Sequence, residues 1–193
     1  MIMRRLAPVC ILALGMAVGA SVDMARAADG DMCPTPPDRT VERDDLLRAL
    51  AGSKNQQQGV SAANAVWDFW IQAPDAEAQE LLERGMAKMR EANYPDAERI
   101  LDQLIAYCPD FPEAWNQRAF ARFLSSRYDE SLADINQTLK LEPAHFGALS
   151  GQAMIYLRQG RAALAQIALK RAVRINPWLQ ERAMIIEDPG TDI

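Results

Sequence analysis

Few side chains in this sequence are of the types that act as a nucleophile, a general base or a soft metal ligand. His145 is the only histidine, and Cys33 and Cys108 are the only cysteines outside the apolar N-terminal segment. A zinc site needs about four His, Cys or carboxylate ligands, and the stretch ALSG at 148–151 lacks the first glycine of a Gly-x-Ser-x-Gly nucleophile motif. We therefore expect no catalytic residue, no metal and no cofactor, and we interpret His145 as a polar residue of a turn.

The two cysteines suggest a structural role. In an oxidising compartment a pair of cysteines often forms one disulfide bond. A Cys33–Cys108 bond would tie an extended N-terminal tail, residues 28–40, to the body of the protein. Two unrelated small thiols would fit the sequence equally well, so both interpretations stay open here.

The first residues follow the order of a secretory signal peptide. Arg4 and Arg5 precede an almost wholly apolar run, and Ala25-Arg26-Ala27 offers a site of the small-x-small type for cleavage. We expect residues 1–27 to be removed and the product to be periplasmic or secreted. No later run is long and apolar enough for a membrane helix, so we expect no membrane insertion after cleavage.

The charge of the chain argues against one class of partner. Its formal net charge is −5, and the expected signal peptide contains more basic than acidic residues, so the remainder is more acidic still. Nucleic-acid binding depends on Lys and Arg side chains that neutralise phosphates, and no basic block is present. We therefore expect a partner other than nucleic acid.

The chain repeats itself every 34 residues. Pro109, Pro143 and Pro177 mark the period. Within each period the apolar residues have helical spacing, with a polar or glycine break halfway, which predicts a helix, a tight turn and a second helix ended by the proline. Small residues recur where two such helices would cross, at Gly85, Ala119 and Ala153 and at Ala97, Ser131 and Ala165.

This pattern resembles the tetratricopeptide repeat family. The resemblance rests on the period, both small positions, the tyrosine shared by Tyr94 and Tyr128, and the terminal proline, and it covers about residues 78–177. It implies an all-α fold, an α-solenoid whose first helices line a concave groove. The three hairpins would span 78–111, 112–145 and 146–177.

Residues 41–74 precede the repeats and predict a pair of helices, either a cap or a degenerate extra repeat. A stack of repeats exposes an apolar face at each end unless something covers it. The second helix of the pair carries Trp67, Phe69 and Trp70. We expect it to cap the first hairpin, with occupation of the groove as the alternative.

Residues 178–193 follow the last repeat and predict a short capping helix. Trp178, Met184 and Ile185 would face inward, and Pro189-Gly190 would end the helix.

The family resemblance also implies a set of groove residues, all from the first helix of each hairpin. Most are apolar, and several are the flexible methionines that adapt to differently shaped partners. These side chains are Leu82, Met86, Met89, Arg90, Asn116, Phe120, Phe123, Leu124, Ser150, Met154, Leu157 and Arg158.

We expect a non-catalytic scaffold or adaptor in the periplasm that binds a protein or peptide segment in this groove. Arg90 and Arg158 would suit an amphipathic helix or an extended apolar peptide with an acidic group. One alternative is a periplasmic holdase or assembly factor for envelope or apocytochrome clients. The other is an enzyme that uses His145.

Overall fold

The structure, a computed structural model, describes residues 33–35 and 37–186. In this part of the chain it has eight α-helices and one 3-10 helix, which confirms the all-α prediction. The helices are α1 (Thr40–Ala51), α2 (Gln56–Trp70), α3 (Ala76–Arg90), α4 (Tyr94–Tyr107), α5 (Pro112–Leu124), α6 (Tyr128–Leu141), α7 (Phe146–Arg158), α8 (Ala162–Ile175) and η1 (Gln180–Met184). The expected signal peptide (1–27), part of the tail (28–32 and 36) and the end of the expected cap (187–193) lie outside the described residues.

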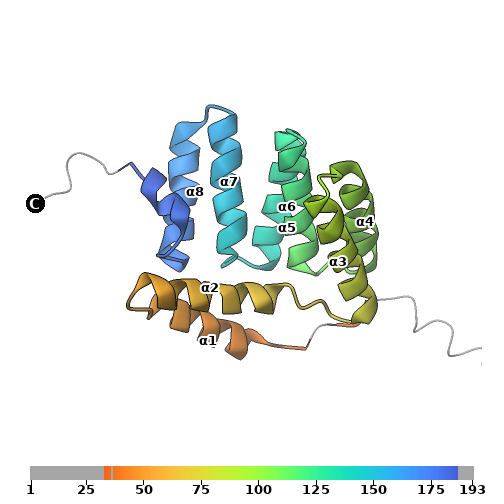
Figure 1. Ribbon diagram of the computed structural model, residues 1–193, viewed down its shortest axis with the longest axis horizontal. Helices are drawn as coiled ribbons and strands as arrows, with labels where there is room; N and C mark the ends of the chain where they lie inside the picture. Colours follow the sequence, from red (N-terminus) through yellow and green to blue (C-terminus); the bar gives the residue numbers. More distant parts are fainter. Residues whose placement is uncertain (1–32, 36, 187–193) are drawn as a thin grey trace, which may run out of the picture. The chain divides into compact units, whose positions relative to one another are not determined.

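Three helical hairpins, α3–α4, α5–α6 and α7–α8, stand side by side (Figure 1). The turn inside each hairpin contains one residue with positive φ: Ala92 at 56°, Ser126 at 60° and Gly160 at 72°. In the first turn the amide of Ala92 donates to the carbonyl of Met89, and that of Asn93 donates to Lys88. This is the Schellman arrangement, which satisfies carbonyls that a helix end leaves unpaired.

Small residues lie where the two helices of a hairpin cross. A Cβ on Gly85 would come within 2.9 Å of the Leu101 side chain, so this position needs a glycine or a shift of Leu101. In the second hairpin the Ser131 hydroxyl donates to the carbonyl of Ala119 at 2.7 Å, a contact that only close helices permit. The small positions therefore set the distance between paired helices.

The helical pair α1–α2 does not take the place we expected. Instead of capping the first hairpin, α2 lies across the ends of the hairpins, with α1 on its outer side (Figure 1). Trp67 and Trp70 pack against Phe146 at the start of α7, with ring centroids 5.5 and 4.8 Å away. The turns between repeats carry aromatic residues in this chain, and these turns provide the apolar surface that α2 covers.

Two glycines permit this docking. A Cβ on Gly59 of α2 would lie 2.1 Å from the Trp178 ring, and a Cβ on Gly147 of α7 would lie 2.3 Å from the Trp67 ring. Each tryptophan therefore packs directly on a backbone, one at each end of the contact. Each position tolerates a larger residue only if the indole moves.

The C-terminal end is covered by η1 and the residue after it. Ile185 packs on Ala153 and Leu169 of the last hairpin, as expected for a cap. Met184 is 40% exposed, so its expected inward orientation is wrong. The physical reason is the tighter 3-10 geometry of η1, which places side chains in a different register from an α-helix.

A disulfide bond joins Cys33 to Cys108, which follows α4, so the segment before α1 is attached to the first hairpin. The two cysteines are 75 positions apart in the sequence. Among the described helices, none has both the length and the apolar character needed to span a bilayer.

Candidate functional site

The single histidine is a buried structural residue. His145 is 0% exposed, and its Nδ1 accepts a hydrogen bond from the amide of Ala148 at 3.1 Å, which caps the start of α7. Because Nδ1 accepts, the ring proton lies on Nε2, which donates to Glu113 Oε2 at 2.9 Å. The Trp70 ring stacks on the imidazole, with centroids 3.9 Å apart. Both ring nitrogens are therefore engaged, and α2 separates the ring from solvent.

Glu113 is the centre of this polar network. Its carboxylate is also 0% exposed and accepts hydrogen bonds from Asn116 at 3.2 Å and from Gln117 at 2.6 Å, in addition to His145. A buried carboxylate needs such donors to offset its lost hydration. The network joins α5 to the start of α7, and Asn116 and Gln117 also face the groove described next. Within residues 33–35 and 37–186, no three His, Cys, Asp or Glu side chains are placed to hold a metal ion.

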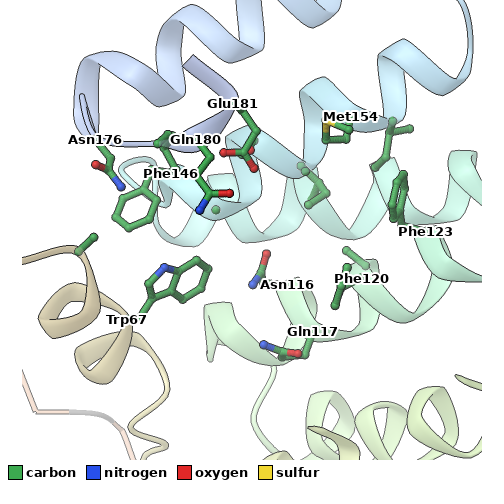
Figure 2. A pocket seen from close by; sticks show the side chains of 18 of the residues that line it. Trp67, Asn116, Gln117, Phe120, Phe123, Phe146, Met154, Asn176, Gln180 and Glu181 are labelled. Atoms are coloured by element: carbon green, nitrogen blue, oxygen red, sulfur yellow. The ribbon is translucent and has the colours of Figure 1, made fainter. Parts of the chain in front are cut away.

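The main cavity of the described chain lies along the first helices of the hairpins and has a volume of about 800 Å³. Met86 and Met89 reach it from α3, Phe120 and Phe123 from α5, and Met154 from α7. Figure 2 shows Phe120, Phe123 and Met154 around this space, with Asn116 and Gln117 beside them. Phe120 is 50% exposed, so a large apolar side chain is left open to solvent inside a concave surface.

Helix α2 forms a second wall of the same cavity. Its lining residues lie three or four positions apart and therefore share one face of the helix. They are Gln56, Val60, Ala63, Asn64 and Trp67. Figure 2 shows Trp67 directed into the space near Asn116 and Phe146. The cavity is thus a groove between α2 and the row formed by α3, α5 and α7.

Most of the groove residues expected from the sequence do line this cavity. Those that the structure brings together are Met86, Met89, Arg90, Asn116, Phe120, Phe123, Ser150 and Met154.

The remaining expected residues lie elsewhere. Leu82 is 0% exposed and packs with Leu101 and Ala114 in the core between the first two hairpins, so placing it in the groove was wrong. Leu82 lies one helical turn before Met86, in a part of α3 that packs against the next hairpin and does not face the groove. Leu124, Leu157 and Arg158 are at the far ends of α5 and α7 and do not line the cavity.

Sequence reasoning considered the second helix of the N-terminal pair as a cap or as an occupant of the groove. It missed that α2 forms a wall of a groove that stays open, and it missed the residues beyond α8 that close one end. The latter are Asn176, Trp178, Leu179, Gln180 and Glu181. The spacing of Gln56, Val60, Ala63 and Trp67, three or four positions apart, indicates that they share one face of a helix. Only the docking of α2 across the hairpins shows which surface that face meets.

An ion-pair network fixes α5 from its other side. Arg118 donates to Asp134 of α6 and to Asp102 of α4, with contacts of 2.7 Å. Burial alone would lower the pKa of Arg118, but the hydrogen bonds and charges of these two aspartates more than offset it, so the pKa lies above its ordinary value. Asp134 also accepts from Arg122 at 2.8 Å. The helix that carries Asn116, Phe120 and Phe123 is therefore held by both of its neighbours.

Comparisons with known proteins agree with this architecture. A model of the family described as Tetratricopeptide repeat matches residues 82–134 and 121–177. A TPR repeat-containing protein of Rhizobium etli is 34% identical over 134 residues, which are 69% of this chain and 66% of that protein. The chain therefore spans slightly less than two thirds of the length of this relative.

Two solved structures are similar in fold. The first TPR of Spaghetti (RPAP3), bound to the HSP90 peptide SRMEEVD, has a TM-score of 0.55 at 20% identity and covers 57% of this chain and 88% of that one. The TPR2AB-domain:pHSP90 complex of yeast Sti1 has a TM-score of 0.52 at 17% identity and covers 66% of this chain and 49% of that one.

The chain belongs to the tetratricopeptide repeat family. Proteins of this family are generally non-catalytic scaffolds for protein–protein interaction, and the similar structures named above were solved with peptide partners or in a complex. The fold by itself does not name a partner or a binding surface for this chain.

Proposed function

We propose that this protein is a non-catalytic scaffold or adaptor of the periplasm that binds a peptide or protein segment in the groove between α2 and the first helices of the hairpins. One observation carries the proposal. Phe120 and Val60, from opposite walls, remain 50% and 45% exposed inside the same concave cavity. Large apolar side chains gathered in an open cavity mark a binding site, because their exposure to water is unfavourable until a partner covers them.

The periplasmic location is part of the proposal. It is supported by the signal-peptide pattern of residues 1–27 and by the Cys33–Cys108 disulfide, since such bonds persist in oxidising compartments. The absence of catalysis is supported by the state of His145, whose two nitrogens bind Glu113 and the amide of Ala148.

The test is an affinity capture from an envelope extract. The bait is the protein expressed from its full sequence and purified as it accumulates, beside a Phe120→Glu/Met154→Glu double variant. Ile167→Glu is the matched control, since Ile167 is 58% exposed and does not line the groove. Circular dichroism must show the same helix content in all three proteins.

We expect one partner to be retained by the protein and by the Ile167→Glu control and to be lost from the double variant. The captured partner, titrated against the same three proteins, should show the same order of affinity. Many unrelated apolar clients, lost together, would favour the alternative of a periplasmic holdase or assembly factor. Capture that is unchanged in the double variant would overturn the assignment of the groove as the binding surface.

A further inference from the structure

The groove has one charged side chain near each end. Among its described lining residues Arg90 is the only basic one and Glu181 the only acidic one. Arg90 ends α3 and Glu181 lies in η1, at opposite ends of the row of hairpins (Figure 1). Neither side chain makes an ion pair or a hydrogen bond within the described chain, whereas Glu98, Arg118 and Arg122 outside the groove are all paired. Two unpaired charges of opposite sign are therefore available to a ligand.

Carboxamide side chains occupy both walls between these charges. Gln56 and Asn64 face the cavity from α2, and Asn116 and Gln117 face it from α5. The last two donate their N–H groups to Glu113, which leaves their oxygens as acceptors. Gln56 and Asn64 have no side-chain hydrogen bond in the described chain, so both their donors and their acceptors are free.

This lining suits an extended backbone better than a helix. An extended segment presents unpaired N–H and C=O groups on both sides, whereas the backbone groups of a helix are already bonded to one another. Carboxamides on two facing walls can pair with both kinds of group. The volume of about 800 Å³ is within the usual range of about 300–1,000 Å³ for ligand sites, so the segment that lies inside the groove is short.

We propose that the groove selects a short extended peptide segment of mixed charge, with an apolar centre, an acidic group at the Arg90 end and a basic group at the Glu181 end. The apolar centre lies against Phe120 and Met154, and the backbone lies between the carboxamides of α2 and α5. This inference rests on the proposed function and adds to it the chemistry and the polarity of the partner.

Four synthetic peptides test it, with the same centre, Leu-Met-Ala-Leu, and blocked termini. Their flanking residues are Glu and Glu, Arg and Arg, Glu then Arg, or Arg then Glu. Affinities are measured by fluorescence polarisation at low ionic strength, where exposed charges are least screened. We expect one of the two mixed peptides to bind at least about tenfold more tightly than both uniform ones, because charge complementarity determines orientation and selectivity.

An Arg90→Glu/Glu181→Arg double variant should transfer this preference to the mixed peptide of the opposite order. The matched control is Arg158→Glu/Glu80→Arg, which exchanges the same two charges at exposed positions outside the lining. It should leave the preference unchanged. Methylation of a central peptide N–H should weaken binding, and Asn64→Ala should reduce the size of that effect if the carboxamide binds the backbone.

Equal affinity for mixed and uniform peptides overturns the inference, as does a preference that the charge exchange does not alter. No detectable binding of any peptide also overturns it. If all four peptides bind equally and Phe120→Glu abolishes that binding, the proposed function stands and only the charge selection fails. If Phe120→Glu binds the peptides as tightly as the unaltered protein does, both the inference and the use of the groove as the binding surface fail.

Discussion

Single residues decide how α2 docks. His145 would be an ordinary polar turn residue if α2 were absent, but the Trp70 ring covers it and Glu113 accepts a hydrogen bond from its Nε2. Gly147, two residues later, has no side chain because the Trp67 ring occupies the place where its Cβ would be. His145, which the sequence offered as the one possible catalytic histidine, thus helps to attach α2 to the repeat array.

A Gly147→Ala variant should therefore be less stable. Its Cβ would come within 2.3 Å of the Trp67 ring, and relieving this overlap should cost about 1–3 kcal/mol of unfolding free energy. Gly151→Ala, four residues further along α7, is the matched control. Its Cβ would make an ordinary 3.4 Å contact with Ile135, and the better helix propensity of alanine should raise stability by up to about 1 kcal/mol.

Urea unfolding followed by far-UV circular dichroism measures both variants, and tryptophan fluorescence reports on the position of α2. Opposite signs for the two substitutions are the expected outcome. Equal effects would show that Trp67 does not pack on the backbone of α7.

At the scale of the helix, each hairpin depends on its turn. Each of the three turns has one residue in the left-handed conformation, and these residues are 34 positions apart. Only the third of them is a glycine. A residue with a Cβ in this conformation has an energy about 1–2 kcal/mol higher than in the right-handed region. The repeat geometry therefore overrides local preference at Ala92 and Ser126, because the Schellman bonds and the packing of the two helices hold the turn.

The substitutions Ala92→Gly and Ser126→Gly should each raise the unfolding free energy by about 0.5–1 kcal/mol, since glycine adopts positive φ without the Cβ clash. Gly160→Ala should lower it by a similar amount. No heavy atom outside its chain neighbours lies within 4 Å of a Cβ built on Gly160, so that loss would come from the backbone alone. Thermal and urea unfolding of the three variants show whether the unfolding free energy rises or falls. A Gly160→Ala variant that is more stable would contradict this prediction.

At the scale of the whole molecule, neighbouring hairpins are joined by ionic as well as apolar contacts. Glu98 of α4 accepts a hydrogen bond from Arg122 of α5 at 2.8 Å and pairs with Arg127, which precedes α6. Burial alone would raise the pKa of Glu98, but these two arginines more than offset burial and hold the pKa below its ordinary value of 4.5. The unfolding free energy should therefore fall when the pH is lowered.

At pH values well above 4.5, Glu98 is ionised in both the folded and the unfolded protein, and its contribution to stability is complete. Below that pH the unfolded chain takes up the proton first, so stability falls until the pH passes the lower folded pKa. Glu98→Gln should be less stable at neutral pH and should lose less further stability on acidification. Urea unfolding from about pH 7 down to about pH 3 tests this, with the exposed Glu80→Gln as control. Parallel curves for Glu98→Gln and the unaltered protein would contradict it.

Local sequence was sufficient for the hairpins. The 34-residue period, the small residues at the helix crossings and the prolines act within one repeat or between adjacent repeats, and the helices formed where these signals indicated. The family resemblance implied that Met86, Phe120 and Met154 face the groove, and all three line the cavity. The buried position of Leu82 did not follow, since it depends on how far the next hairpin extends over α3.

The position of α2 was decided by the tertiary structure. Its composition predicts a helix whose aromatic side chains are buried against another surface. Several apolar surfaces of a repeat stack could cover them equally well. The choice depends on fits between distant residues, Gly59 with Trp178 and Gly147 with Trp67, whose pairing no local pattern encodes. That choice converts an open concave face into a two-walled groove and brings the carboxamides of Gln56 and Asn64 to it. The repeats therefore follow from local sequence, whereas the proposed binding site depends on long-range contacts, because its second wall exists only after α2 has docked.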